Sequence, residues 1–293
     1  MITSLYNIIE RIRRPLTRRK IFSLSSSLTY ANGIKKPYLI LSFDCDSPED
    51  AIASKELSVW LMRKKAIPAV FAVPGRRIES SPGTYSEISR AGFEFMNHGY
   101  LDHAEFNQAL GRYTSTTWYH EMSETAVRED IRRGHDTIRN ILGIEAKGFR
   151  VPHFGYYQSP EQLEVIYSES ERLGYSYAST TMPSHALHNG AAYRAVRGII
   201  EFPLTGTFDR PEELLDSWCY MAAPDRVYTP KEYVLQFCKM VNFFANNGLP
   251  CILNYYADPS HVIDSRAYFD CIEYALESGF EATTYARLVQ QVT

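Results

Sequence analysis

The chain lacks the sequence features of membrane-spanning, secreted and repetitive proteins. No run of about 18 apolar residues occurs, so no transmembrane helix is expected. The basic N-terminus is not followed by an apolar core, which argues against a secretory signal. The five cysteines are scattered and include no CxxC pair, which favours reduced thiols in a cytoplasmic protein. A net charge of −3 gives no reason to expect nucleic-acid binding, and no internal repeat is visible.

The charge that is present is concentrated at the N-terminus, where residues 1–20 hold six basic side chains and one acidic one. Residues 1–14 have apolar residues on one helical face, and Pro15 is expected to end that helix. The Ser-rich residues 21–34 are typical of a linker. We therefore divide the chain into a basic amphipathic N-terminal helix and linker (1–34) and a catalytic domain (35–293). The helix either lies on an anionic membrane surface, packs on the domain, or is frayed.

Beyond residue 35, apolar β-prone runs alternate with segments of helical periodicity. The expected strands are 38–43, 68–73, 92–98, 147–152, 175–179, 199–204, 250–256 and 281–285. The expected helices between them are 48–65, 83–91, 123–142, 160–173, 230–247 and 264–278, with long loops at 104–119 and 180–197. This alternation predicts parallel strands with helical crossovers. Because polar residues gather at successive strand ends, we predict an α/β fold, a distorted (β/α) barrel of seven or eight mostly parallel strands.

Three of the predicted strands end in residues that can form one hydrolytic site. The first ends at Asp44 and Asp46, a later one delivers His98 with His103 close behind it, and another carries Arg150. One carboxylate and two imidazoles, here Asp46, His98 and His103, can hold a divalent metal and leave positions open for water and substrate. Zinc is the first expectation from the ligand types, and cobalt, nickel or manganese remain alternatives.

The remaining groups have complementary roles in this hypothesis. Asp44 is the free carboxylate that can take a proton from a metal-bound water, and Arg150 can hold it ionised and oriented. The amide N–H of His153 can help to stabilise an oxyanion. The candidate general acid for an amine leaving group is His261.

Each signal also has a purely structural interpretation. An Asp-x-Asp after a strand is often a helix N-cap, and residues 46–49 have that pattern. Two nearby histidines can decorate a loop, and Arg150 can be a surface charge. The aromatic residues of 100–119 and 154–157 can line a sugar-binding groove or belong to the core. The hydrolytic interpretation is favoured because three compatible signals lie at three strand ends.

Taken together, these motifs resemble the polysaccharide deacetylase family, carbohydrate esterase family 4. Phe43-Asp44-Cys45-Asp46 resembles its first motif, Asn97-His98 with His103 its second, and Phe149-Arg150-Val151-Pro152 its third. The resemblance covers roughly residues 38–285, and its specific part is 39–155. It implies a distorted (β/α) barrel and metal-dependent hydrolysis of N-acetyl groups on sugars. It also implies Asp44 as base, Asp46, His98 and His103 as metal ligands, and Arg150 as the group that orients the base.

The sequence departs from the family pattern at three places. The two histidines are spaced i, i+5 where i, i+4 is usual, which makes Asp102 a rival ligand to His103. The Asp that orients the family's general acid has no clear match between residues 175 and 190. The late Leu-x-His motif is displaced or replaced, so that His261 or Asp258 would serve instead.

The leading hypothesis is a cytoplasmic metal-dependent hydrolase that removes an N-acetyl or other N-acyl group from a sugar, polysaccharide or lipid-linked glycan. The basic residues 1–20 would suit peripheral contact with the inner membrane face. The alternatives are hydrolysis of another C–N bond, in a formamide or cyclic ureide, and a non-catalytic carbohydrate-binding protein on the same scaffold. The sequence does not indicate the oligomeric state.

Overall fold

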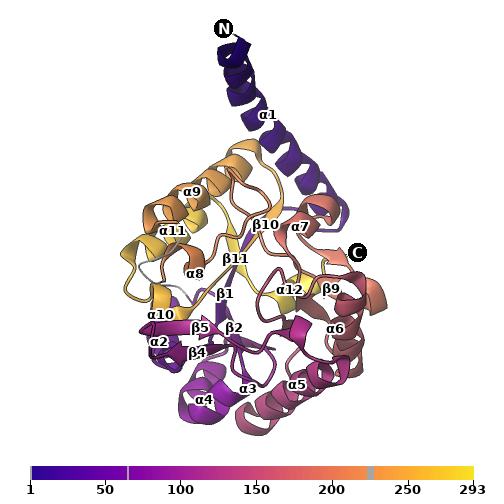
Figure 1. Ribbon diagram of the computed structural model, residues 1–293, viewed down its shortest axis with the longest axis vertical. Helices are drawn as coiled ribbons and strands as arrows, with labels where there is room; N and C mark the ends of the chain where they lie inside the picture. The colour runs from indigo at the N-terminus through magenta and orange to yellow at the C-terminus, as the bar shows by residue number, and fades with distance from the viewer. Residues whose placement is uncertain (1, 65, 223–227) are drawn as a thin grey trace.

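A curled sheet of mostly parallel strands forms the centre of the molecule (Figure 1). The computed structural model describes residues 2–64, 66–222 and 228–293, with side chains from residue 16 onward. The strand order is β10-β1-β2-β3-β6-β7-β9-β8, β11 pairs with β1, and only β8 and β9 pair antiparallel. The strands are β1 (Pro37–Asp44), β2 (Val70–Val73), β3 (Glu94–Asn97), β6 (Gly148–Arg150), β7 (Tyr177–Ser179), β8 (Tyr193–Arg194), β9 (Ile200–Glu201), β10 (Cys251–Ala257) and β11 (Glu281–Thr283).

The segment that follows β9 forms hydrogen bonds with β10. The amide of Thr205 donates to the carbonyl oxygen of Asn254 at 2.9 Å, and the Thr205 hydroxyl donates to the carbonyl oxygen of Ile252 at 3.0 Å. These bonds connect the segment after β9 to β10 and so help to close the curled sheet. The predicted α/β fold, a distorted (β/α) barrel of mostly parallel strands, is confirmed.

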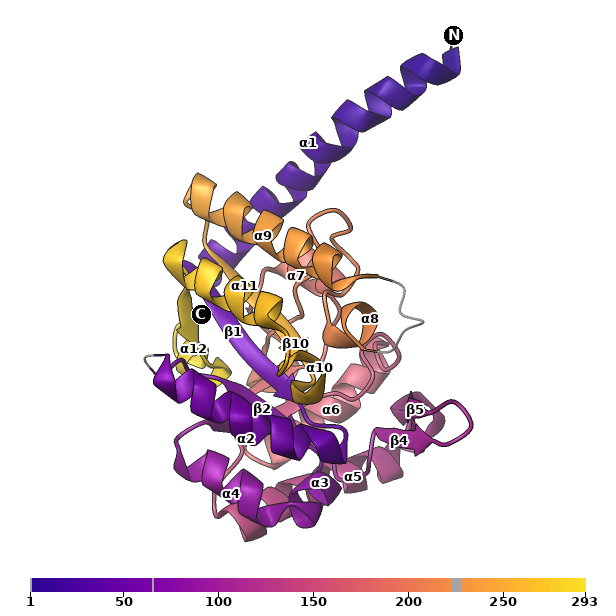
Figure 2. The same ribbon diagram turned by 90° about the vertical axis from the view of Figure 1, so that its left-hand side faces the viewer.

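Helices connect the strands and cover the outside of the sheet (Figures 1 and 2). Several begin at side-chain caps that the sequence supplies, such as the Ser47 and Asp50 capping box of α2 and the Thr229 cap of α9. The α-helices are α1 (Ile2–Ala31), α2 (Pro48–Arg63), α3 (Gly75–Ser80), α4 (Pro82–Arg90), α5 (Glu124–Thr137), α6 (Pro160–Arg172), α7 (Pro183–Asn189), α8 (Ser217–Tyr220), α9 (Pro230–Asn247), α10 (Pro259–Val262), α11 (Arg266–Glu277) and α12 (Tyr285–Val289). Helical turns of other types are η1 (Tyr119–Glu121), the π-helix η2 (Ile138–Leu142) and η3 (Val196–Gly198).

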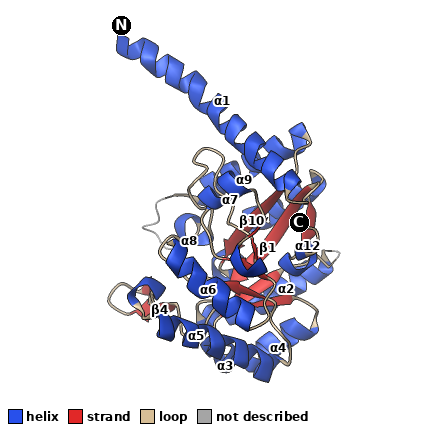
Figure 3. Ribbon diagram, turned by 90° about the vertical axis from the view of Figure 1, so that its right-hand side faces the viewer, coloured by secondary structure: helices blue, strands red, loops and turns tan. Residues whose placement is uncertain are grey.

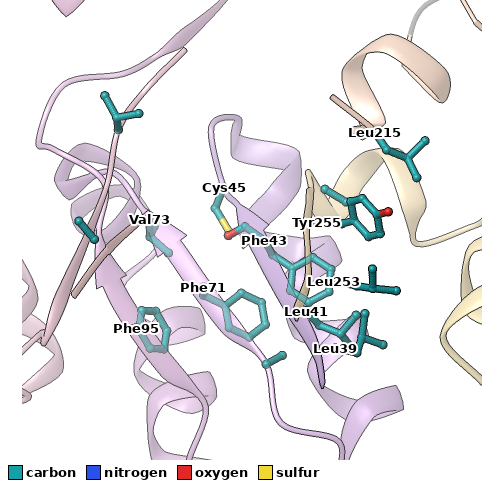
Figure 4. Close-up of a cluster of buried hydrophobic side chains, with 14 of the residues drawn as sticks. Leu39, Leu41, Phe43, Cys45, Phe71, Val73, Phe95, Leu215, Leu253 and Tyr255 are labelled. Atoms are coloured by element: carbon teal, nitrogen blue, oxygen red, sulfur yellow. The ribbon is translucent and has the colours of Figure 1, made fainter. Parts of the chain in front are cut away.

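The core between sheet and helices determines which way the site residues point. Figure 4 shows Phe43, Phe71 and Phe95 side by side on three neighbouring strands. The ring centroids of Phe43 and Phe71 lie 5.5 Å apart, and those of Phe71 and Phe95 lie 5.8 Å apart. Because side chains alternate between the faces of a strand, packing Phe43 against the helices turns Ser42 and Asp44 toward the barrel interior.

The N-terminal helix differs from the prediction in two ways. Helix α1 does not end at Pro15, and residues 21–31 are helical rather than a linker. The reason is tertiary packing: Phe22 is buried and stacks on Phe208 at 5.6 Å, and Ser26 donates to the carbonyl oxygen of Pro250 at 2.7 Å. This packing fixes the second half of the helix and outweighs the weak helix propensity of its serines. The apolar face expected on residues 2–12 lies outside the described side chains.

Figures 2 and 3 show the first half of α1 extending away from the rest of the molecule. Arg18 of α1 forms an ion pair with Asp209 of the domain, at 2.7 Å. Within the described residues, no helix is both long and apolar enough to cross a membrane. That the first 34 residues form a unit separate from a domain at 35–293 stays a prediction.

The two long segments expected to be loops contain regular structure. Residues 104–119 form the antiparallel hairpin β4 (Ala104–Asn107) and β5 (Arg112–Ser115) followed by η1. Residues 180–197 include helix α7, which packs against α1. The strands of the hairpin and helix α7 are all short. Local periodicity therefore did not indicate them.

Candidate metal centre and active site

The two aspartates lie at the C-terminal edge of β1. Asp44 is the last residue of β1 and is only 4% exposed, and Asp46 lies two residues further, just before α2. The N-cap of α2 is Ser47, whose amide donates to Asp50 Oδ2 at 2.8 Å. The interpretation of Asp46 as a helix cap is therefore wrong, and its carboxylate is available to the site.

The two histidines come to the same place from the end of β3. His98 directly follows β3, and its Nδ1 makes a 2.9 Å hydrogen bond with the carbonyl oxygen of Arg150. A carbonyl only accepts, so Nδ1 carries the proton and Nε2 keeps its lone pair. His98 Nε2 lies 3.5 Å from Asp46 Oδ1, and His103 Nδ1 lies 3.3 Å from the same oxygen.

These three side chains fit a divalent metal ion. One ligand atom of each lies within 4.8 Å of the others. Asp46 Oδ1 and both ring nitrogens of His103 are buried and have no hydrogen-bond partner among the described residues. Buried polar atoms without partners are costly, and a cation would satisfy them. A carboxylate with two imidazoles is also a ligand set that zinc prefers.

Asp102, the rival ligand, has other partners. Its carboxylate lies 2.7 Å from Arg77 Nε and 3.7 Å from Arg76 Nη1. It is not part of the group of close ligand atoms found in the described residues. The geometry thus favours His103 over Asp102 in spite of the unusual spacing.

Asp44 lies beside this cluster and beside a buried arginine. Arg150 Nε is 3.8 Å from Asp44 Oδ1, and His98 Nε2 is 3.9 Å from Asp44 Oδ2. Arg150 is fully buried, and its Nη2 donates to Ser42 Oγ and to Tyr285 Oη, both at 2.7 Å. Burial raises the pKa of Asp44 to about 7, against the opposing effect of the Arg150 charge.

Two residues of the metal cluster, His98 and Asp46, both have lowered pKa values. Burial and the neighbouring His103 lower the pKa of His98 to about 3, so its imidazole is neutral, the form that binds metals. Burial opposes ionisation of Asp46, but the polar ring nitrogens of His103 and His98, which lie 3.3 and 3.5 Å from Asp46 Oδ1, hold the pKa of Asp46 well below its usual range. A neutral imidazole beside an ionised carboxylate is the state a metal site needs.

A cavity of about 290 Å³ opens in front of Asp44 and Asp46. Its walls are largely aromatic: Trp118 stacks on His153 with ring centroids 4.2 Å apart and meets Tyr156 at 4.6 Å. The full lining comprises Asp44, Asp46, His98, His103, Ser115, Trp118, His153, Phe154, Tyr156, Leu214, Asp216, Trp218, Cys219 and Tyr256.

Two hydrogen bonds of Thr116, which directly follows β5, hold one wall of this cavity in place. The amide of Thr116 donates to the carbonyl oxygen of His103 at 2.7 Å, and His153 Nε2 donates to the carbonyl oxygen of Thr116 at 2.6 Å. Thr117 and His153 both have positive φ, 56° and 52°, which non-glycine residues rarely adopt. Strained residues of this kind often occur at functional sites.

His261, the predicted general acid, is not among the described residues that line the cavity. Its Nδ1 is 3.1 Å from Ser217 Oγ and 3.7 Å from Asp258 Oδ2, and its ring meets Trp218 edge-on at 5.3 Å. Among the described residues, Trp218 lines the cavity and His261 does not. Burial lowers the pKa of His261 to about 4, against the effect of the Asp46 charge. Its role stays a prediction.

Sequence reasoning missed several lining residues, among them Asp216, Trp218 and Tyr256. Tyr256 had a usable signal, because it lies near the C-terminal end of β10, in register with Ser42 of β1. The rule that pointed to Asp44 and Arg150 also applies to that strand. Asp216 and Trp218 follow an irregular stretch without periodicity, so no local pattern marked them.

Fold and site together define a class: an α/β barrel with a candidate metal-dependent hydrolytic centre at the C-terminal edge of its strands. The family model of the polysaccharide deacetylases matches residues 32–177. That segment belongs to the polysaccharide deacetylase family, as its motifs predicted. It includes both aspartates, both cluster histidines and Arg150.

Solved structures show the same fold over most of the chain. A Mycobacterium smegmatis structure assigned to the polysaccharide deacetylases has a TM-score of 0.66 and 18% identity, covering 88% of this chain and 91% of that one. An allantoinase has a TM-score of 0.62 and 13% identity, with 87% and 89% covered. A family 4 carbohydrate esterase from Streptomyces lividans, in complex with acetate, has a TM-score of 0.51 and 14% identity, with 85% and 92% covered. The search of curated protein sequences finds no match.

Proposed function

We propose that this protein is a metal-dependent hydrolase that removes an N-acetyl or other N-acyl group from a sugar, polysaccharide or lipid-linked glycan. The observation that carries this proposal is the buried cluster of Asp46, His98 and His103 with Asp44 beside it. The polysaccharide deacetylase family implies an acetylated carbohydrate as substrate. The aromatic walls around Trp118 and Tyr156 suit stacking against a sugar ring.

In this mechanism the protein's own groups position and move protons. Asp46, His98 and His103 would hold the metal, most suitably zinc, which when bound polarises the acyl group and lowers the pKa of water. Asp44 takes the proton of the attacking water, and Arg150 keeps that carboxylate oriented. In this proposal the amide of His153, in the strained turn beside the cavity, donates to the developing oxyanion.

Substrate comparison tests the reaction type. The zinc-loaded protein should release acetate from N-acetylated chitooligosaccharides and leave N-formyl sugars and cyclic ureides largely unchanged. Product analysis by chromatography separates these outcomes. Turnover of the ureide alone would replace the proposal by a cyclic-ureide amidohydrolase. Binding of the oligosaccharide without turnover would favour a non-catalytic carbohydrate-binding protein, a relevant outcome because a family 4 pseudoenzyme shares the fold.

Metal content tests the ligand set. After zinc loading and dialysis, the wild-type protein should retain near-stoichiometric zinc and His103→Ala should lose it, because both His103 ring nitrogens lack other partners among the described residues. Asp102→Asn is the matched control and should retain zinc, since Asp102 pairs with Arg77. Zinc lost from Asp102→Asn and retained by His103→Ala would make Asp102 the ligand.

We also propose that α1 contacts an anionic bilayer, which would place a cytoplasmic enzyme at the inner membrane face beside a lipid-linked substrate. The support is that the first half of α1 extends away from the domain and that residues 1–20 are strongly basic (Figure 2). Each Arg near an anionic surface contributes about 1 kcal/mol of binding.

Vesicle sedimentation measures this contact. The protein should sediment with vesicles containing phosphatidylglycerol and not with pure phosphatidylcholine, and added salt should weaken the binding. Replacing Arg11, Arg13 and Arg14 by Gln should abolish it. The matched control replaces three exposed arginines of the domain, Arg63, Arg90 and Arg139, and should still sediment. Equal sedimentation of the two triple variants would refute the contact.

A further inference from the structure

The site as described lacks an assigned proton donor on its cavity wall. An amine leaves an amide readily only when its nitrogen receives a proton. Asp44 is occupied as the base, and His261 does not line the cavity among the described residues. One further carboxyl group does line it, that of Asp216, which is 2% exposed.

We propose that Asp216 is the general acid that protonates the leaving nitrogen, an inference that rests on the proposed deacylase function. Asp216 precedes α8, and its Oδ1 accepts a 2.8 Å hydrogen bond from the amide of Cys219. That bond fixes the carboxyl group at the cavity wall. The proton would come from the carboxyl oxygen that turns toward the substrate.

The surroundings of Asp216 and Asp44 differ in the way that an acid and a base require. Asp44 has the buried Arg150 guanidinium 3.8 Å away, whereas no Lys, Arg or His of the described chain forms an ion pair with Asp216. A buried carboxyl group without a cation retains its proton more readily. Burial accordingly raises the pKa of Asp216, partly offset by the Cys219 amide. Two carboxyl groups in unlike environments commonly divide the two roles.

Tyr256 lines the cavity together with the two carboxyl groups. Its ring lies 5.4 Å from that of Phe154, and β10 places Tyr256 next to Ser42 of β1. Burial raises the pKa of Tyr256 well above its usual value. The phenol thus stays protonated in the cavity that Asp44 and Asp216 also line. In this proposal Tyr256 is a positioning residue, because it lines the same cavity wall as the base and the acid.

The step balances with water as the only co-reactant. Water gives one proton to Asp44 while its oxygen bonds to the acyl carbon. The C–N bond then breaks, its electron pair stays on nitrogen, and nitrogen takes the proton of Asp216. Asp44 releases its proton and Asp216 regains one through solvent. The products are one carboxylic acid and one amino sugar.

Leaving-group dependence tests this assignment. The zinc-loaded wild type and Asp216→Asn are compared on an N-acetylated chitooligosaccharide and on 4-nitrophenyl acetate, whose phenolate leaves without a proton. Asn preserves the oxygen that accepts from Cys219. We expect Asp216→Asn to lower kcat on the amide by about 100-fold or more while the ester rate and the zinc content stay close to wild type.

Two further variants, Tyr256→Phe and His261→Gln, test whether the selective loss of amide hydrolysis is specific to Asp216. Tyr256→Phe, as a change to a positioning residue, should lower kcat on the amide less than Asp216→Asn does. His261→Gln should lower amide and ester rates by the same factor. A selective amide defect in His261→Gln, or equal losses on both substrates in Asp216→Asn, would overturn the assignment of Asp216. A wild type that hydrolyses neither substrate would instead overturn the proposed function, and this inference with it.

Discussion

Asp44→Asn is expected to abolish turnover while zinc remains bound. The substitution keeps the shape of the side chain and removes only the ability to accept a proton, so kcat on the acyl sugar should fall by at least about 10²–10⁴-fold. The ligands Asp46, His98 and His103 are unchanged, and zinc content should match wild type. Asp46→Asn should behave differently and lose the metal together with the activity.

Measuring both the zinc content and the turnover of each variant separates the role of a general base from that of a metal ligand. An Asp44→Asn protein that turns over normally would show that Asp44 is not the base. A protein that loses zinc would show that Asp44 is a ligand, which its 3.9 Å distance to His98 Nε2 does not suggest. Asp102→Asn serves again as the control, because that carboxylate pairs with Arg77.

Asp44→Asn should also stabilise the folded state of the metal-free protein at neutral pH. Burial raises the pKa of Asp44 from 3.8 to about 7, so the folded state holds a proton that the unfolded state releases. The free energy of unfolding of the wild type therefore falls between about pH 4 and pH 7 and stays lower above that range. With chelator present, Asp44→Asn should melt at a higher temperature than wild type at pH 8, and the difference should shrink near pH 4. A difference that does not change with pH would contradict this origin.

The parts of the site that the sequence predicted are those that strand geometry alone places. Asp44 and His98 come at the ends of apolar runs, and parallel strands bring such ends to one edge. Spacing alone could not identify His103 as the third metal ligand, because Asp102 directly precedes it in the sequence. The ion pair of Asp102 with Arg77 is a tertiary contact that no local pattern encodes.

The parts that could not be predicted depend on packing between distant segments. Phe22 and Ser26 continue α1 through a Ser-rich stretch because they contact Phe208 and Pro250, about 190 and 220 residues away. Asp216 lies next to the cavity only because the chain between β9 and α9 folds back over it. Such tertiary contacts outweigh local secondary-structure propensity. For this reason hydrophobic periodicity predicted the barrel but not the second half of α1 or the position of Asp216.

The largest effect on stability is expected for Arg150→Met. Arg150 is fully buried, donates two 2.7 Å hydrogen bonds to Ser42 and Tyr285, and is the cation nearest to Asp44 among the described residues. Removing one partner of a buried pair leaves the other charge uncompensated, at a cost of about 3–5 kcal/mol. Urea unfolding of the metal-free protein measures this loss. Arg139→Met, which breaks an exposed pair with Asp136, is the control and should cost less than about 1 kcal/mol.

A double-mutant cycle shows how much of that cost belongs to Asp44. In an Asp44→Asn background the buried carboxylate is absent, so Arg150→Met should cost markedly less than in the wild type, with a coupling energy of about 1–3 kcal/mol. The cost that remains reflects the hydrogen bonds to Ser42 and Tyr285. Equal costs in the two backgrounds would mean that Arg150 stabilises the barrel through those hydroxyls alone. In that case Arg150 would have no electrostatic part in keeping the base ionised.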